Sequence, residues 1–331
     1  METVRLMGAF SPNPRLEPLL DGTVRIPGVD IQWQFGKPPD LHQRHLTENS
    51  FDLFEFSLSN FMITRSQPAQ LKRLRWMAIP IFLTKAINWL DFTVREDSGI
   101  TSLADLAGKR VGIPDYHMTA AIWMRIVLKE LYGIRPQDIE WFNGRPPGVS
   151  HGRDVGKALS PGITLLRAKQ PGELEERLSR GEIDATYADS VTRAALMRVQ
   201  SLRPLFGPGE GAEVIGAYRR KTGIIPVNHV LLVQQQLVEQ DAAMAMRLYT
   251  AFETSKQKAY ERALRFAAGY LLFAEDAFAR QAAVFGDDPF PSGLAANRSM
   301  IETLARESFE EGLLGSMPDI DALFCETVRS T

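Results

Sequence analysis

The amino-acid sequence predicts an α/β protein of two lobes, and three patterns support this. Short apolar runs with strand character alternate with helical patterns in residues 1–93, and the alternation starts again in residues 94–223. Such alternation favours mainly parallel sheets with helices on both faces. A long apolar run at 224–233 is then followed by a helical pattern that continues to the end of the chain.

The predicted lobe boundaries follow from the places where these patterns change. We expect lobe 1 to be discontinuous and to comprise 1–93 and 224–331, whereas lobe 2 comprises 94–223. The chain is predicted to cross between the lobes near 92–96 and near 222–228.

In the first lobe, alternating or wholly apolar runs predict the strands. We expect strands at 4–7, 30–35, 51–54, 77–82 and 92–94. A loop at 11–22 leads into a short helix, and an apolar helix is predicted at 58–65.

In the second lobe and the C-terminal part, apolar runs again predict strands, and helical patterns predict longer helices. Strands are predicted at 109–113, 139–142, 163–167 and 183–187, and helices at 119–132, 171–180 and 212–221. After the strand at 224–233, helical patterns cover 235–264, 266–284 and 294–313, with a break at the sequence DDPFPSG.

Composition excludes several classes of partner. The 331 residues carry a net charge of −2, so the chain shows no basic surplus that would indicate nucleic-acid binding. No run of eighteen apolar residues predicts a membrane span. The start METVRLMGAF has no basic n-region and no apolar h-region, which predicts a cytoplasmic protein. Cys325 is the one cysteine, and it is expected to be a packed side chain rather than a nucleophile.

The most informative segment is 105–133, DLAGKRVGIPDYHMTAAIWMRIVLKELYG. A short strand, a loop and the start of a helix follow one another here. The first N–H groups of a helix lack partners within the helix, so this layout suits an anionic ligand. The loop also carries Asp115, Tyr116 and His117. We expect a carboxylated ligand to fit such a place.

Several motifs resemble those of the 4,5-dihydroxyphthalate decarboxylase family. They are GKRVGIPDYHMTAAIWMRIVLKELYGI, DLFEFSLSNFMI, GEIDA, YRRKTGIIPVNHVLLV and GDDPFPSGLAANRSMIETLARESFEEGL, in the same order and from nearly end to end. The resemblance implies a type 2 periplasmic-binding-protein-like fold with a ligand cleft between two lobes and a helical C-terminal segment. It also implies decarboxylation of a hydroxylated aromatic carboxylate. The segment LTKAINWLD departs from the family pattern, with Asn88 and Trp89 where Arg and His are usual.

Three residues are candidates for catalysis. His117 lies in the loop before a helix and is the first candidate for the general acid, although a solvated or capping histidine is the plainer interpretation. His229 begins an apolar strand near a crossing and is either a core histidine or the alternative acid. Glu55 lies in an apolar run, where it caps the next helix, contacts the ligand or acts as a base.

Other side chains are candidates for substrate binding. Arg15 and Lys85 lie in predicted strand-end loops, where they are carboxylate ligands or ordinary surface charges. Thr119 is expected to cap the helix and to face an anion. Tyr116 and Trp123 are core residues or stacking partners of an aromatic ring, and Arg125 is a solvated or ion-paired residue that we include among the candidates. His42, His45 and His151 are interpreted as surface residues.

No organic cofactor is expected, because ring hydroxyls can supply the electrons that expel CO2. No H-x-H, H-E-x-x-H or C-x-x-C motif is present, but a divalent metal stays open, for example between Glu55 and His229. Two hypotheses follow besides a decarboxylase: a solute-binding protein for a small carboxylate, and a sensor or synthase subunit with the same cleft. The expected partner is a small aromatic carboxylate, not nucleic acid or a membrane, and a homo-oligomer stays open. Glu55, Lys85, His117 and His229 are predicted to converge on one pocket between the lobes.

Overall fold

The computed structural model describes residues 3–66, 74–85, 87, 91–148, 150, 159–187, 201–207 and 209–331. The chain forms two compact units. Unit 1 comprises Met1–Lys85, Val227–Glu302 and Pro318–Thr331, and unit 2 comprises Ala86–Pro226 and Thr303–Met317. The predictions for Asn88, Trp89 and His151 lie outside the described residues.

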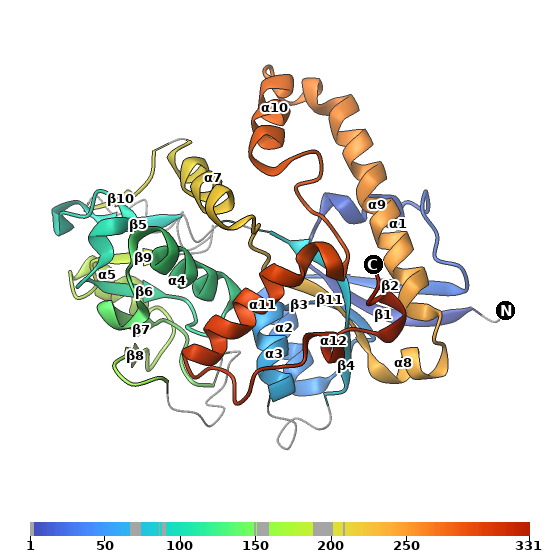
Figure 1. Ribbon diagram of the computed structural model, residues 1–331, viewed down its shortest axis with the longest axis horizontal. Coiled ribbons are helices and arrows are strands. Elements are labelled where there is room, and N and C mark those ends of the chain that lie inside the picture. The colour runs from blue at the N-terminus through green and yellow to red at the C-terminus, as the bar shows by residue number, and fades with distance from the viewer. Residues whose placement is uncertain are drawn as a thin grey trace. The chain divides into compact units, whose positions relative to one another are not determined.

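The sheet of unit 1 has five strands in the order β2-β1-β3-β11-β4. Strands β1 and β2 are parallel, as are β1 and β3, whereas β11 is antiparallel to both of its neighbours. Figure 1 shows β11 between β3 and β4, far from either in sequence. The strands are β1 (Val4–Phe10), β2 (Val29–Phe35), β3 (Leu53–Ser57), β4 (Trp76–Thr84) and β11 (His229–Gln234).

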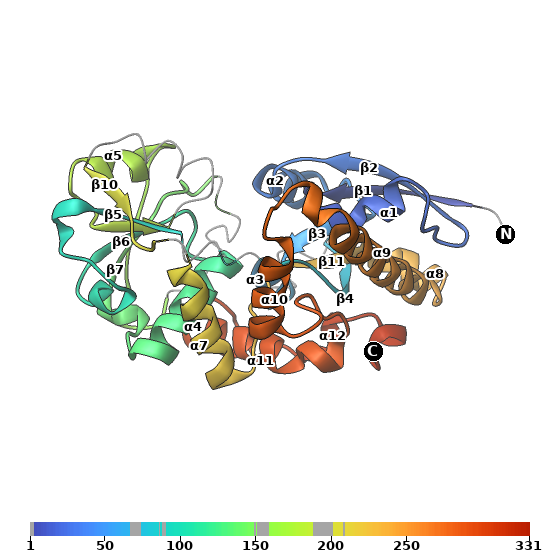
Figure 2. The ribbon, with the colours of Figure 1, turned by 90° about the horizontal axis from the view of Figure 1, so that it is seen from above.

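Helices cover both faces of this sheet. The long helix α9 (Met244–Phe266) lies along one face, where Leu248 and Phe252 pack with Leu53 and Leu231 in an apolar core (Figure 2). On the other face, α2 (Pro38–Glu48) places His45 against Phe54 and Trp76. The remaining helices with residues in unit 1 are η1 (Pro14–Leu16), α1 (Glu17–Leu20), α3 (Leu58–Ser66), α8 (Gln235–Gln240), η6 (Ala267–Gly269), α10 (Ala274–Phe285), α11 (Leu294–Glu310), α12 (Ile320–Leu323) and η7 (Glu326–Val328).

Unit 2 contains a six-stranded sheet in the order β10-β5-β9-β6-β7-β8. The four strands β9, β6, β7 and β8 are parallel, and β5 is antiparallel to β9 and β10. Both sheets are therefore mixed rather than mainly parallel. The strands are β5 (Phe92–Arg95), β6 (Arg110–Ile113), β7 (Glu140–Asn143), β8 (Thr164–Arg167), β9 (Ala185–Tyr187) and β10 (Leu202–Pro204).

The helices of unit 2 pack closely on its sheet. On α5 (Glu173–Ser179), Leu174 lies so near β6 that a Cβ on Gly112 would be 2.2 Å from its Cδ1, so a larger residue there would require the Leu174 side chain to move. Val111 and Ile113, the neighbours of Gly112 on β6, are fully buried. The other helices of unit 2 are η3 (Glu96–Ser98), η4 (Leu103–Leu106), α4 (Thr119–Tyr132), η5 (Pro136–Asp138) and α7 (Glu210–Thr222).

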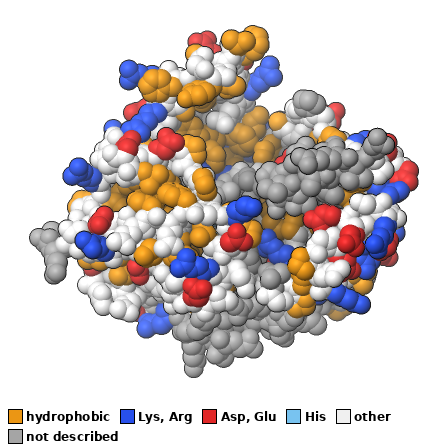
Figure 3. All heavy atoms as spheres, turned by 180° about the vertical axis from the view of Figure 1, so that it is seen from behind, with side chains coloured by type: hydrophobic (Ala, Val, Ile, Leu, Met, Phe, Trp, Pro, Cys, Tyr) orange, Lys and Arg blue, Asp and Glu red, His pale blue; other side chains and the backbone are white. Residues whose placement is uncertain are grey.

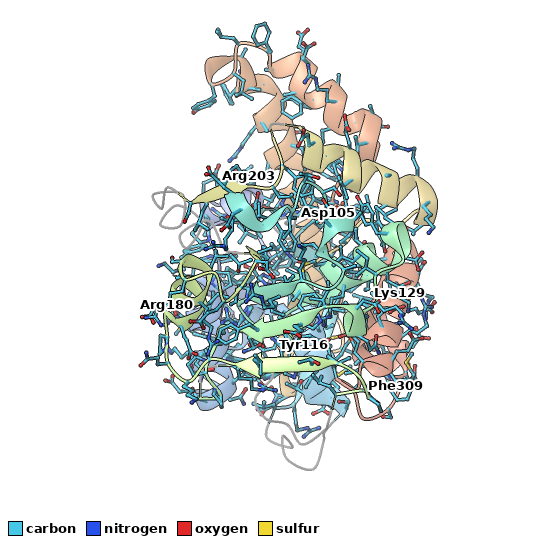
Figure 4. The ribbon with its side chains drawn as sticks, turned by 90° about the vertical axis from the view of Figure 1, so that its left-hand side faces the viewer. Asp105, Tyr116, Lys129, Arg180, Arg203 and Phe309 are labelled. Atoms are coloured by element: carbon cyan, nitrogen blue, oxygen red, sulfur yellow. The ribbon has the colours of Figure 1, made fainter. Side chains whose placement is uncertain are left out.

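One C-terminal segment differs from the predicted domain division. Residues 303–317 were expected in lobe 1, but they belong to unit 2. Lys129 on α4 forms ion pairs with Glu307 and Glu310 of α11 at 2.8 and 3.1 Å, and Figure 4 shows Lys129 and Phe309 on the edge where these helices meet. The unit boundaries at 85/86 and 226/227 also differ by a few residues from the predicted ones. Contacts between residues so far apart in sequence leave no local pattern.

Most predicted elements agree with the structure within a few residues, but four differ. The helix predicted at 266–284 is observed only as the short η6 and, from Ala274, as α10. Helix α2 was not predicted, because it buries His42, His45 and Leu46 instead of an apolar stripe. Strand β11 begins at His229 rather than at residue 224. The predicted helix 235–264 is divided at Asp241, whose extended backbone ends α8 and whose carboxylate accepts a hydrogen bond from the N–H of Ala243 at 3.1 Å in the turn before α9.

The surface assignment of His42 and His45 was wrong, since these side chains are 4% and 0% exposed. Cys325 is buried as predicted, and burial raises the pKa of its thiol to about 12. In the part of the chain that the structure describes, no helix is long and apolar enough to cross a membrane.

Candidate functional site

Polar residues gather at one edge of the sheet of unit 1. The carboxyl ends of β1, β3 and β4 meet there with the beginning of the antiparallel strand β11. Ser11 follows β1, Thr84 ends β4 and His229 begins β11. His229 is paired with Ser57 and Leu231 with Glu55, so His229 lies diagonally across from Glu55 on neighbouring strands.

Glu55 is the centre of this cluster and is only 3% exposed. Its Oε2 accepts hydrogen bonds from the N–H of Ser11 at 2.9 Å and from the hydroxyl of Ser11 at 2.5 Å. Its Oε1 accepts the hydroxyl of Thr84 at 2.6 Å and lies 2.6 Å from Nδ1 of His229. Because both oxygens of Glu55 make these contacts at the edge of the sheet, the carboxylate does not cap the next helix.

The pKa of Glu55 indicates whether Glu55 or Nδ1 of His229 carries the proton between them. Burial alone would raise this pKa, but hydrogen bonds and charge from His229, with those from Ser11 and Thr84, lower it to about 2. An ionised carboxylate only accepts hydrogen bonds. Nδ1 of His229 must therefore carry the proton that it shares with Glu55, which leaves Nε2 as the atom that can exchange a proton.

His42 is a neighbour of this pair that sequence analysis placed on the surface. Its ring centroid lies 5.0 Å from that of His229 in an edge-on arrangement, and 4.7 Å from the ring of Phe56. The His229 side chain itself is 15% exposed. His42, itself packed against Phe56, thus lies against one side of the His229 imidazole while part of that ring stays accessible.

Arg15 lies beyond the same strand edge and is held by neutral groups. Its guanidinium donates to the carbonyl of Leu83 and, at 3.3 Å, to Oδ1 of Asn13, and it stacks 3.8 Å from the ring centroid of Phe290. Among the described residues, no carboxylate forms an ion pair with it. Burial lowers the pKa of Arg15 although Tyr260, Glu55 and Asp288 act in the opposite direction. Lys85 directly follows Thr84 and is partly buried.

Unit 2 contains a second histidine–carboxylate pair in the loop between β6 and α4. Asp115 is 0% exposed, and its Oδ1 lies 3.4 Å from Nδ1 of His117. The hydroxyl of Ser150 lies 3.2 and 3.1 Å from the two oxygens of Asp115, and Nη1 of Arg145 lies 3.5 Å from Oδ2. The amide oxygen of Asn143 accepts the N–H of Tyr116 at 2.5 Å and fixes the loop.

Thr119 does not cap α4 as predicted. Met118 occupies the N-cap position, its side chain makes no capping bond, and Thr119 is the first helical residue at 2% exposure. Trp123 is fully buried and meets Tyr218 edge-on at 6.5 Å. Trp123 is therefore a core residue.

Arg125 and Tyr116 form the buried centre of unit 2. Arg125 is 1% exposed, and its Nη2 lies 2.8 Å from the carboxylate of Glu311 while its guanidinium stacks 3.8 Å from the ring centroid of Tyr116. Burial alone would lower the pKa of Arg125, but Glu311 outweighs it and raises the pKa. Figure 4 marks Tyr116 within this unit. These contacts give Arg125 and Tyr116 a structural role: of the two expectations for Arg125, the ion pair is confirmed and the solvated position is wrong.

The structure thus joins Glu55 and His229 in unit 1, with Arg15 and Lys85 near the same strand edge. His117 belongs to unit 2, so the convergence of all four residues stays a prediction. Ser11, Thr84 and Ser150 were not predicted as site residues, and His42 was predicted on the surface. Ser11 and Thr84 lie at strand ends, which is a signal that could have identified them. Within the described ranges, no three His, Cys, Asp or Glu side chains are placed to hold a metal ion.

Two α/β units with mixed sheets and polar strand ends define a periplasmic-binding-protein-like protein. The alkanesulfonate-binding protein SsuA from Xanthomonas axonopodis pv. citri shares the fold with a TM-score of 0.58, at 15% identity over 98% of this chain and 99% of that one. The NMT1/THI5 like family model matches residues 28–149.

Two curated relatives identify the family. The 4,5-dihydroxyphthalate decarboxylase of Comamonas testosteroni is 30% identical over 315 residues, which cover 95% of this chain and 94% of that protein. The protein of the same name from Pseudomonas putida is 30% identical over 56% of this chain and 70% of its own length. The chain belongs to the 4,5-dihydroxyphthalate decarboxylase family.

Proposed function

We propose that this protein is a decarboxylase of a hydroxylated aromatic carboxylate. The observation that carries the proposal is the bond between the ionised Glu55 and Nδ1 of His229 at an accessible strand edge, because this carboxylate stabilises the imidazolium, whose Nε2–H can then deliver a proton. A buried carboxylate held by three other donors is fixed in place before substrate binds. The names of the two curated relatives support this class of reaction.

The proposed reaction exchanges a proton for CO2. A ring hydroxyl donates electron density into the ring, and Nε2–H of His229 transfers its proton to the carbon that bears the carboxylate. The C–CO2 bond then breaks, its electrons restore the aromatic ring and CO2 leaves. Glu55 stabilises the imidazolium before the transfer and keeps its tautomer, as the carboxylate of a catalytic triad does.

Arg15 is proposed to bind a carboxylate that stays on the substrate. Its guanidinium is stacked on Phe290 and is partly buried, and no ion pair within the described residues neutralises it. A bidentate arginine–carboxylate contact would fix the ring beside His229. If Arg15 bound the departing carboxylate strongly, it would stabilise the ground state and oppose the reaction. We therefore propose that Arg15 binds a second carboxylate of the substrate, which is not lost. Lys85 is proposed to add positive charge at the same edge.

His117 is the second candidate for proton transfer. Its contact with Asp115 is longer, at 3.4 Å, than the 2.6 Å between His229 and Glu55. A longer and weaker contact fixes the imidazole less firmly. We therefore assign the acid to His229 first and to His117 second.

A solute-binding protein is the alternative, and the fold favours it. The neighbour SsuA from Xanthomonas axonopodis pv. citri is named as an alkanesulfonate-binding protein. The same strand edge and Arg15 would then hold a small aromatic carboxylate without turnover.

Release of CO2 from a panel of dihydroxylated aromatic acids distinguishes the two functions. The panel starts with 4,5-dihydroxyphthalate and includes isomers with the hydroxyls or carboxylates moved, because residues 84–91 depart from the family pattern. It is run with and without divalent metal ions, with calorimetric binding measured in parallel. Catalytic release of CO2 that is lost in His229→Ala supports the decarboxylase. Tight binding without CO2 release across the panel would establish the solute-binding function instead.

A further inference from the structure

The end of α9 and helix α10 form a helical arm that lacks a core of its own. We define the arm as residues 257–287. Figure 1 shows this part of unit 1 extending beyond the sheet, with α10 at its end. Of its residues, all of which the structure describes, only Ala267 and Ala274 are buried. Two short helices with so little buried apolar surface are only marginally stable in water by themselves.

The turn of this arm presents large apolar side chains to solvent. Leu272 is 96% exposed, Tyr270 88% and Phe273 76%, values that approach those of an extended chain. Figure 3 shows hydrophobic side chains gathered on this projecting end. We call this group the apolar patch, and its members are Leu264, Phe266, Tyr270, Leu271, Leu272 and Phe273.

The size of the patch is sufficient for a stable protein interface. The three aromatic members would carry about 150–250 Å² each if fully exposed, and with the three somewhat smaller leucines the exposed parts of the six residues amount to roughly 800 Å². The largest apolar patch on a typical monomer covers about 300–600 Å². Each partner of a standard interface contributes about 800 Å². One arm therefore offers the area that one side of a dimer needs.

The charges around the patch are balanced. On the arm as a whole, the four positive and four negative side chains cancel; they are Lys258, Arg262, Arg265 and Arg280, and Glu261, Glu275, Asp276 and Asp287. A surface that binds anionic lipid carries a basic surplus, which this rim lacks. Charges of opposite sign on two copies can instead pair across a two-fold axis, because such an interface brings one patch against itself so that residue i meets residue j and j meets i.

We propose that the apolar patch is the interface with a second copy of this chain, formed by two arms across a two-fold axis. The patch shares no residue with the candidate site, so the proposal is independent of the proposed function. Burying the six side chains removes their apolar area from water, which is the main favourable term in protein association. The arm is then ordered by its partner rather than by its own core.

Sedimentation velocity and light scattering over a concentration series test the proposal. The wild type is expected at a multiple of the chain mass, and Leu272→Glu is expected to shift to the mass of one chain or to dissociate at much higher concentration. Leu166→Glu is the matched control, because Leu166 is 54% exposed in unit 2 and far from the arm in sequence. It should leave the mass unchanged. Far-UV circular dichroism checks that all three proteins are folded.

A spin label gives a second measurement that does not depend on destabilising the arm. Leu272→Cys adds an exposed thiol, while the native Cys325 is buried and its thiol pKa is raised, so it labels poorly. Pulsed dipolar spectroscopy should show a short distance between two labels, which dilution with unlabelled protein removes. A wild type that stays monomeric, an oligomer unaffected by Leu272→Glu, or a monomer that binds anionic vesicles through the patch would each overturn the proposal.

Discussion

The two units each contain a buried carboxylate beside a histidine, but the pairs are built differently. Asp115 and His117 are two residues apart in one loop, whereas Glu55 and His229 are separated by 174 residues and meet through strand pairing. The local pair has a contact of 3.4 Å and the distant pair one of 2.6 Å. A strand-to-strand contact holds both side chains on rigid backbone, while a loop pair depends on the loop.

The partners of the two carboxylates differ as well. Glu55 receives the N–H and hydroxyl of Ser11 and the hydroxyl of Thr84 in addition to His229. Asp115 accepts the hydroxyl of Ser150 at 3.1 and 3.2 Å and the N–H of His117 at 3.3 Å, and Nη1 of Arg145 lies 3.5 Å from its Oδ2. The difference between the two units is thus the shorter histidine–carboxylate contact of the tertiary pair, which is the reason for proposing His229 before His117 as the proton donor.

The largest expected effect is on catalysis. His229→Ala should lower kcat by about 10²–10⁴, because a placed general acid acts mainly in the transition state. His117→Ala should lower kcat less and leave KM nearly unchanged if its pair is the weaker donor. Steady-state kinetics on the best substrate of the panel measure both variants, and thermal unfolding checks their folding. A greater loss in His117→Ala would reverse the assignment.

The second-largest expected effect is on the free energy of unfolding at acid pH. The pKa of Glu55 is about 2 in the folded protein and 4.5 when unperturbed, so its stabilisation is complete above about pH 4.5 and disappears as the pH falls towards 2. The shift corresponds to roughly 3 kcal/mol. Urea unfolding of the wild type and of Glu55→Gln should therefore differ most near neutral pH and converge in acid. A difference that stays constant between these pH values would contradict the ionised state of Glu55.

The smallest effect compares the two serine hydroxyls. Ser11→Ala removes a 2.5 Å bond to an ionised carboxylate and should cost about 1.5–3 kcal/mol, whereas Ser150→Ala removes longer bonds to Asp115 and should cost about 1 kcal/mol. Ser179→Ala, which removes a hydroxyl contact on an exposed helix, is the control and should be nearly neutral. Equal losses at Ser11 and Ser150 would show that the two pairs are equally well fixed.

Much of the fold was accessible from the sequence, since apolar runs and helical periods located most elements. Helix α4 was predicted at its observed bounds, because a continuous apolar pattern is ended by Gly133 in a left-handed conformation. Helix α2 was missed, because its buried face consists largely of His42 and His45. An ion pair was one of the two expectations for Arg125, but its partner Glu311 could not be named from the sequence because it lies 186 residues away.

The sequence by itself determined the alternation of strands and helices, the family motifs and the presence of Asp115 and His117 in one loop before a helix, because these depend on residues that are close along the chain. Only the tertiary structure decided that Glu55 accepts hydrogen bonds from Ser11, Thr84 and His229. Those donors come from three strands whose order in the sheet has no local signature. The pKa of Glu55, and with it the tautomer of His229, follows from that assembly rather than from either residue alone.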